Sequence, residues 1–226
     1  MLSILVENVS KVYKSGVVEV KALSSISLEV YKGDLIAITG PSGAGKTTLL
    51  RIISGLETPT SGKVIIDGLD ITKLSAFEVA WFRRRKIGFK PQEALLIPSL
   101  TLLHNVALPL LLAGYPLTKA EEAAKNLLTR LGLGDKVHRK PNEVSGGEAE
   151  RASLARALIG EPPILILDEP TTHLDEDTAN MVLDLLKEHN EKTKATMVVA
   201  TLDEKVFAIA SRAYYMKGGR LIPKSS

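Results

Sequence analysis

Residues 40–47 read Gly-Pro-Ser-Gly-Ala-Gly-Lys-Thr, and this stretch decides the fold. It follows the apolar run Leu35 to Thr39 and leads into the helix-like segment Lys46 to Ser54, so the glycines lie in a turn between a strand and a helix. Glycines there let successive backbone N–H groups converge on a polyphosphate, and the helix dipole also favours negative charge. The pattern predicts a phosphate-binding loop; an ordinary Gly-rich turn is the alternative.

This loop predicts a nucleotide polyphosphate as the ligand and Mg²⁺ as its cofactor. We expect Lys46 to reach the β- and γ-phosphates, where it also serves catalysis, and Thr47 to bind the metal. The residues expected to hold the nucleotide are Gly40, Ser42, Gly43, Ala44, Gly45, Lys46, Thr47 and Thr48.

A pair of acids follows a second buried strand. The apolar run Ile164 to Leu167 leads directly into Asp168 and Glu169, so the carboxylates emerge at the carboxyl end of a strand, where open α/β sheets bind ligands. Asp168 suits the Mg²⁺ shell, and Glu169 is placed to polarise a water for attack on the γ-phosphate. Two acids that merely end a strand are the alternative, which is weak beside a phosphate loop.

The remaining segments predict a sheet interrupted by a helical insertion. Short runs rich in β-branched residues indicate strands, and helical spacing appears mainly between Leu95 and Leu133. The segments expected as strands are Ile4–Val9, Ile26–Val30, Leu35–Thr39, Lys63–Ile66, Ile164–Leu167 and Thr196–Ala200, and those expected as helices are Lys46–Ser54, Ala120–Leu131, Ala149–Leu158 and Asp177–Glu188. Apolar strands joined by a crossover helix indicate a buried parallel sheet.

Composition narrows the class of protein. The 226 residues are 45% hydrophobic, enough for one large α/β domain with or without an inserted subdomain. The 29 Lys and Arg against 26 Asp and Glu give a net charge of +3 that is spread along the chain, which does not indicate nucleic acid as a partner. The basic run Arg83 to Lys86 is interpreted as a solvated helix end.

The chain contains no cysteine, which excludes disulfides and thiolate metal sites and fits a cytosolic protein. The N-terminal segment meets an acid at Glu7, too early for a signal peptide. The longest apolar stretch, Val106 to Ala113, falls far short of the ~20 residues that cross a bilayer. If the protein acts at a membrane, we expect another chain to span it.

The segment Ser145-Gly146-Gly147-Glu148 precedes a helical stretch, so Ser145 is a candidate N-cap that exposes N–H groups to an anion. Followed by Arg151 and placed about twenty residues before Asp168 and Glu169, it resembles the signature motif of ABC ATPases. The other motifs of that family appear in the same order, and the resemblance covers nearly the whole chain. It implies a P-loop NTPase (RecA-like) fold: an α/β parallel-sheet core over residues 1–92 and 151–226, an antiparallel β layer, and an α-helical subdomain over 93–150.

The resemblance also implies roles for further residues. Tyr13 stands where the family stacks an aromatic ring on adenine, Gln92 matches the glutamine that couples the nucleotide and metal site to the transport partner and to catalysis, and Asp175 matches the dimer-interface loop. Two cassettes would bind head to tail as a homodimer or heterodimer, with ATP between the phosphate loop of one and Ser145, Gly146 and Gly147 of the other. An integral membrane permease subunit would hold the pair at the cytoplasmic face of the membrane.

Within the family, Asn105 to Gly114 and the Ile65-Asp67-Gly68 pattern are similar to the branch that includes lipoprotein-releasing and macrolide-efflux ATPases. That similarity favours export or extraction, and the transported substrate would depend on the membrane subunits.

Leu202 departs from the family pattern. It stands where the family has a histidine that contacts the γ-phosphate, and a Leu side chain neither donates nor accepts a hydrogen bond. Loss of a polar group near developing charge lowers the rate by roughly 10²–10³, so we expect slow hydrolysis with ATP binding retained. A substitution that traps the ATP-bound state, a natural slow ATPase and a degenerate subunit with a competent partner remain three explanations.

Two smaller departures flank the site. Glu148 replaces a glutamine and places negative charge near the signature helix, which would weaken dimer closure if it faced the nucleotide but not if it faced solvent. Lys90 and Pro91 replace an apolar pair before Gln92, and Pro91 restricts Lys90 to extended geometry.

The competing functions are a soluble ABC ATPase acting on DNA or ribosomes, and a non-hydrolysing regulatory cassette.

Overall fold

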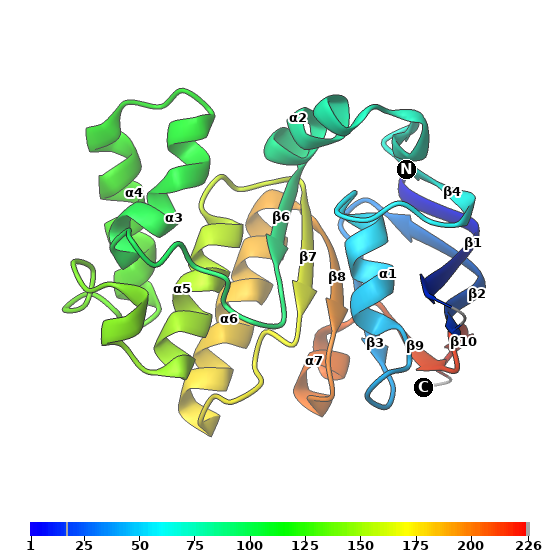
Figure 1. Ribbon diagram of the computed structural model, residues 1–226. Coiled ribbons are helices and arrows are strands. Elements are labelled where there is room, and N and C mark those ends of the chain that lie inside the picture. The colour runs from blue at the N-terminus through cyan, green and yellow to red at the C-terminus, as the bar shows by residue number, and fades with distance from the viewer. Residues whose placement is uncertain (17, 225–226) are drawn as a thin grey trace.

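The computed structural model describes residues 1–16 and 18–224 and shows two β-sheets with helices between and beside them (Figure 1). The strands are β1 (Leu2–Ser15), β2 (Val18–Tyr31), β3 (Leu35–Thr39), β4 (Ser61–Ile66), β5 (Leu69–Asp70), β6 (Ile87–Lys90), β7 (Ile164–Asp168), β8 (Thr196–Ala200), β9 (Arg212–Lys217) and β10 (Arg220–Pro223). The helices are α1 (Lys46–Ile53), α2 (Ala76–Lys86), α3 (Leu102–Leu112), α4 (Leu117–Arg130), α5 (Gly146–Leu158), α6 (Glu176–Thr193) and α7 (Glu204–Ile209), with 3₁₀ turns at Ile71–Lys73 and Pro141–Glu143.

The larger sheet has the order β10-β9-β3-β8-β7-β6, and its strands are parallel except for β10. All five residues of β7 and of β8 are buried, as expected for strands covered on both faces. Because the strands run in one direction, the ends of β3, β7 and β8 meet at one edge of the sheet. The predicted parallel core is confirmed.

The smaller sheet has the order β2-β1-β4-β5 and is antiparallel, which confirms the predicted N-terminal layer. Its first two strands run well beyond the predicted Ile4–Val9 and Ile26–Val30. The sequence predicted strands that were too short, because register shifts between Val6 and Val9 and around Lys11 interrupt the apolar alternation.

Helix α1 lies between the two sheets (Figure 1). Its apolar residues Leu49, Leu50, Ile52 and Ile53 are buried in one cluster with side chains from β1, β2, β3 and β4. A second cluster covers the opposite face of the parallel sheet with residues of α3, α4, α5 and α6. The phosphate loop is therefore anchored by a helix that is packed on both sides.

The helices α3, α4 and α5 form the side of the molecule farthest from the antiparallel sheet (Figure 1). The helix expected over Ala120–Leu131 is present as Leu117–Arg130, and the helix expected from Ala149 begins earlier, at Gly146. Pro109 lies inside α3. No helix among the described residues is both long enough and apolar enough to cross a membrane.

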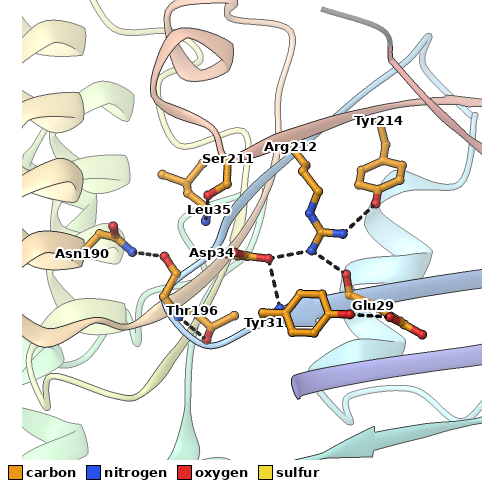
Figure 2. Close-up of polar contacts among 10 residues, drawn as sticks. Glu29, Tyr31, Asp34, Leu35, Asn190, Thr196, Ser211, Arg212 and Tyr214 are labelled. Carbon is orange, nitrogen blue, oxygen red and sulfur yellow. Dashed lines mark hydrogen bonds and ion pairs between the residues drawn. The ribbon is translucent and has the colours of Figure 1, made fainter. Parts of the chain in front are cut away.

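A polar network ties the ends of the two sheets together, away from the phosphate loop (Figure 2). The Arg212 guanidinium lies 2.6 Å from the Asp34 carboxylate and donates to the carbonyl of Glu29 over 2.8 Å. The same carboxylate accepts a hydrogen bond from the backbone N–H of Tyr31. These bonds join β2 and β9 at the turn that enters β3, and so fix the strand from which the phosphate loop emerges.

Candidate nucleotide site

The ends of the parallel strands surround an open cleft of about 430 Å³. Twelve of the residues that line it are expected site residues or Leu202, namely Tyr13, Ser42, Gly43, Ala44, Gly45, Lys46, Thr47, Thr48, Gln92, Asp168, Glu169 and Leu202. Segments from five places in the chain thus meet in one site.

The phosphate loop has the backbone conformation that its glycines permit. Gly45 is the N-cap of α1 with φ 104°, and Gly40 has φ 150°. A Cβ at Gly40 would lie 2.1 Å from the carbonyl oxygen of Met216, so this position admits no side chain. The Lys46 ammonium donates to the carbonyl of Gly40 over 2.6 Å and to that of Pro41 over 3.3 Å. The loop is folded around its own lysine, with the α1 N-terminus facing the cleft.

Thr47 and Asp168 bring two oxygen ligands together. The Thr47 hydroxyl donates to Oδ2 of Asp168 over 2.7 Å, although the residues are 121 positions apart. Burial raises the pKa of the Asp168 carboxyl, and the hydrogen bond from Thr47 opposes this effect. Carboxylate and hydroxyl oxygens are the ligands that Mg²⁺ prefers, and it usually takes only one or two from protein when phosphates supply others. The residues present therefore fit Mg²⁺.

The Glu169 carboxylate is held by two donors. Its Oε2 accepts from the Thr172 hydroxyl over 2.9 Å and from the backbone N–H of Leu202 over 3.3 Å. Glu169 has φ 48°, in the left-handed region that is uncommon for a residue with a side chain. Such outliers concentrate at functional sites. The Leu202 side chain is 63% exposed at the cleft, where it supplies no polar atom.

Tyr13 lines the cleft beside α1. Its hydroxyl lies 3.4 Å from the Thr48 hydroxyl, and Lys11 Nζ lies 5.2 Å from the ring centroid. Burial is the largest cause of its raised pKa. The ring is 40% exposed, so it offers apolar surface to a planar base.

The signature segment and Asp175 lie outside the cleft as it is formed by the described residues of one chain. Ser145 is the N-cap of α5: its hydroxyl accepts from the N–H of Glu148, and the Glu148 carboxylate accepts from the N–H of Ser145. The predicted cap is confirmed. Asp175 caps α6, and its carboxylate accepts a hydrogen bond from the N–H of Thr178 over 2.9 Å.

The Glu148 carboxylate turns back to the cap and to Lys136, with which it forms an ion pair. The Lys136 ammonium is the main cause that lowers the pKa of Glu148 to about 2, and the N–H of Ser145 adds to it. The Glu148 carboxylate therefore has neither of the two orientations that the sequence left open, toward the nucleotide or toward solvent. Its charge is balanced within the chain by Lys136 and the cap of α5.

Sequence reasoning missed several residues at the cleft. Val20, Lys21, Ala22, Thr172 and His173 also line it. Thr172 carried a signal, since a hydroxyl three residues after Glu169 can reach its carboxylate. The residues from β2 carried none, because only the tertiary fold brings that strand to the phosphate loop.

A strand, a glycine-rich loop and a helix N-terminus facing an acid at the end of a neighbouring strand define a phosphate-loop nucleotide-binding protein. A family model described as ABC transporter matches residues 23–172. The chain belongs to the ABC transporter family, as one of its ATP-binding cassettes.

Relatives of similar identity have different names. An uncharacterized ABC transporter ATP-binding protein of Thermotoga maritima is 44% identical over 85% of this chain and 82% of its own. The lipoprotein-releasing system ATP-binding protein LolD of Shewanella frigidimarina is 43% identical over 96% and 90%. A dimeric structure of the ATP-binding cassette MJ0796 in a post-hydrolysis state, bound to ADP and Pi, has a TM-score of 0.93 and 39% identity, with 96% of each chain covered.

Proposed function

We propose that this chain is the ATP-hydrolysing subunit of a transporter, that it works as one half of a nucleotide-sandwich dimer, and that its turnover is slow. The observation that carries the proposal is the convergence of the phosphate loop, the Thr47–Asp168 pair and the Glu169 carboxylate on one cleft. ATP and Mg²⁺ are the ligands that this set of donors fits.

In this scheme the N–H groups of the loop and the Lys46 ammonium bind the phosphates, and Tyr13 stacks on the base. Thr47, Asp168 and Gln92 would hold Mg²⁺, which neutralises charge on the phosphates when it is bound. Glu169 orients a water and accepts its proton, because Thr172 and Leu202 already fix one of its oxygens. The water is then aligned without the imidazole of the histidine that Leu202 replaces.

The second half of the site comes from a second cassette. Ser145, Gly146 and Gly147 stand at the exposed N-terminus of α5 but outside the cleft of their own chain. We propose that they complete the cap of α5 with the phosphate of the partner's nucleotide, with Asp175 at the same interface. The dimeric state in which MJ0796 was solved supports this arrangement.

A membrane subunit has a suitable docking surface. A groove of about 670 Å³ lies between α2, β6, α3 and the end of α5, with Leu95, Leu108, Leu112 and Tyr115 among its apolar residues. Arg83, Arg84 and Arg85 line it too. We propose that it receives an amphipathic helix of the permease that carries an acid toward these arginines, which places the chain at the cytoplasmic face of the membrane. We further propose that residues 93–150 act as the helical subdomain that responds to binding of the permease.

Relatives that share 43% identity are named for lipoprotein release and for methionine import. This is expected if the membrane subunit, rather than the cassette, forms the path of the substrate. A regulatory cassette that hydrolyses nothing is the second candidate, favoured by Leu202. The Glu169 carboxylate, which is present and accepts two hydrogen bonds, supports hydrolysis instead.

The deciding experiment compares the purified chain with Glu169→Gln. We expect ATP-dependent dimerisation by light scattering for both, hydrolysis for the parent, and none for the variant. A parent that binds ATP but releases no phosphate under single-turnover conditions would contradict hydrolysis and support a regulatory cassette instead.

The permease is tested separately. Because the chain contains no cysteine, a single cysteine at Leu112 permits cross-linking of the groove in native membranes. We expect a cross-linked conjugate with a polytopic membrane protein, and we expect Leu108→Glu to abolish its formation. Conjugates with soluble proteins alone would contradict coupling to a membrane subunit.

A further inference from the structure

A lysine is buried completely at the end of β6. Lys90 has an exposed fraction of 0%, and it is the last residue of the strand before the Gln92 loop. Its Nζ lies 2.6 Å from Oε2 of Glu150 in α5. At this distance the ammonium and the carboxylate form an ion pair. Glu150 is five residues after Ser145, in the second turn of the signature helix.

The same ammonium reaches the catalytic strand. Lys90 Nζ donates to the carbonyl oxygens of Asp168 and Glu169 over 3.2 and 3.4 Å, and to that of Pro91 over 2.9 Å. A single buried charge therefore contacts the Gln92 loop, the end of β7 and the helix that presents the signature to the partner.

The position of α5 makes this contact possible. Strand β6 turns alternate residues toward the helix, and both Gly88 and Lys90 are buried. A Cβ at Gly88 would lie 2.1 Å from the carbonyl of Ala157, so the helix backbone approaches the strand directly. Farther along the strand the spacing is filled by the Lys90 side chain and Glu150.

We propose that Lys90 is a positioning residue that couples the signature helix to the catalytic carboxylate, through Glu150 on one side and the carbonyls of Asp168 and Glu169 on the other. Two charges buried in this way add little to stability, because desolvation opposes their attraction, and apolar replacements of similar size are often neutral or stabilising. What the pair supplies is a fixed geometry. A displacement of α5 caused by a second cassette at Ser145 would thus be transmitted to the backbone that carries Glu169.

This inference rests on the proposed function, and the test separates the two. The double variant Lys90→Met/Glu150→Leu replaces the pair with apolar side chains of similar size. It is compared with the parent by thermal unfolding, by titration with a fluorescent ATP analogue, and by single-turnover hydrolysis of radiolabelled ATP with protein in excess, which follows slow reactions. A matched control makes the same replacements in the exposed pair Lys192 and Glu161, which lie 2.9 Å apart.

We expect the double variant to stay folded, to bind the analogue within twofold of the parent, and to hydrolyse ATP at least tenfold more slowly, while the control keeps the parent's rate. Its Tm should change only by the loss of the hydrogen bonds from Lys90 to the three carbonyls. A merely structural pair would lower nucleotide affinity together with the rate. A folded double variant whose rate is within twofold of the parent's overturns the inference. A parent that binds no analogue would instead overturn the proposed function.

A second variant guards against failure to fold. Glu150→Gln keeps an acceptor for Lys90 but removes the negative charge. We expect a rate between those of the parent and the double variant, with ATP affinity unchanged; a rate equal to the parent's in this variant also overturns the coupling.

Discussion

The backbone N–H of Leu202 donates a hydrogen bond to Oε2 of Glu169 over 3.3 Å, while the Leu202 side chain stands 63% exposed at the cleft. The main chain at this position therefore serves the carboxylate, and only the side chain lacks a polar group.

The first prediction follows from that separation. Leu202→His leaves the backbone bond to Glu169 in place and adds an imidazole beside the phosphates. We expect turnover to rise by roughly 10²-fold, the reverse of losing a donor near developing charge, with ATP affinity within a few-fold. Steady-state phosphate release measures it, and Leu202→Asn is the control for polarity alone. No gain in either variant would mean that the cassette hydrolyses ATP by another arrangement.

Thr172 fixes the same carboxylate oxygen from the other side, over 2.9 Å. Thr172→Val removes the hydroxyl and keeps the shape, so we expect kcat to fall about tenfold, as for loss of a hydrogen bond to a charged group, with KM unchanged. Thr172→Ser retains the donor and should keep most of the rate. A rise in KM with kcat unchanged would point to a nucleotide-binding role instead.

Metal dependence is predicted from the Thr47–Asp168 pair. Excess EDTA should reduce hydrolysis to background, and Mg²⁺ should restore it. Asp168→Asn leaves an amide for the Thr47 hydroxyl but removes the charge, so the Mg²⁺ concentration for half-maximal rate should rise roughly tenfold or more. Titration of the rate with Mg²⁺ measures the change; an unaltered requirement would remove Asp168 from the metal shell.

Glu148 gives a pH-dependent contribution to stability. Lys136 and the α5 N-terminus lower its pKa from 4.5 to about 2. A group with a depressed pKa stabilises the fold above its unfolded value, and the effect is lost as pH falls from 4.5 toward 2. Glu148→Gln keeps the capping box and should lower the free energy of unfolding by about 1 kcal/mol at pH 7, after allowance for solvent screening.

The difference between Glu148→Gln and the parent should shrink when denaturant unfolding is repeated at pH 5, 4 and 3. A difference that stayed constant across this range would mean that the charge of Glu148 is not what the pairing stabilises.

Gly88 tests the close approach of α5 to β6. A Cβ there would lie 2.1 Å from the Ala157 carbonyl and 2.7 Å from side chains of Leu165 and Pro162. Gly88→Ala should therefore destabilise the protein by about 1–3 kcal/mol, as overpacking does. Gly160→Ala, beyond the end of the same helix with open space at its Cβ position, is the matched control and should be neutral.

Local chemistry made much of the fold predictable. The glycine pattern at residues 40–47 predicted a strand, loop and helix, and β3 and β8 were predicted with their observed bounds. Ser145 was identified as a helix cap because capping depends on residues within one turn. Helix and strand ends shifted where apolar periodicity was broken, as it is by the register shifts in β1.

The sequence alone therefore determined the phosphate loop, the acids at the end of β7, the cap of α5 and the absence of a polar side chain at 202, since each is written in adjacent residues. Only the tertiary structure decided that Lys136 neutralises Glu148, that Thr172 and the Leu202 N–H hold Glu169, and that Lys90 is buried against Glu150. The physical reason is that a charge is stabilised by what lies within a few ångströms of it, and packing brings those partners from segments that the chain order separates.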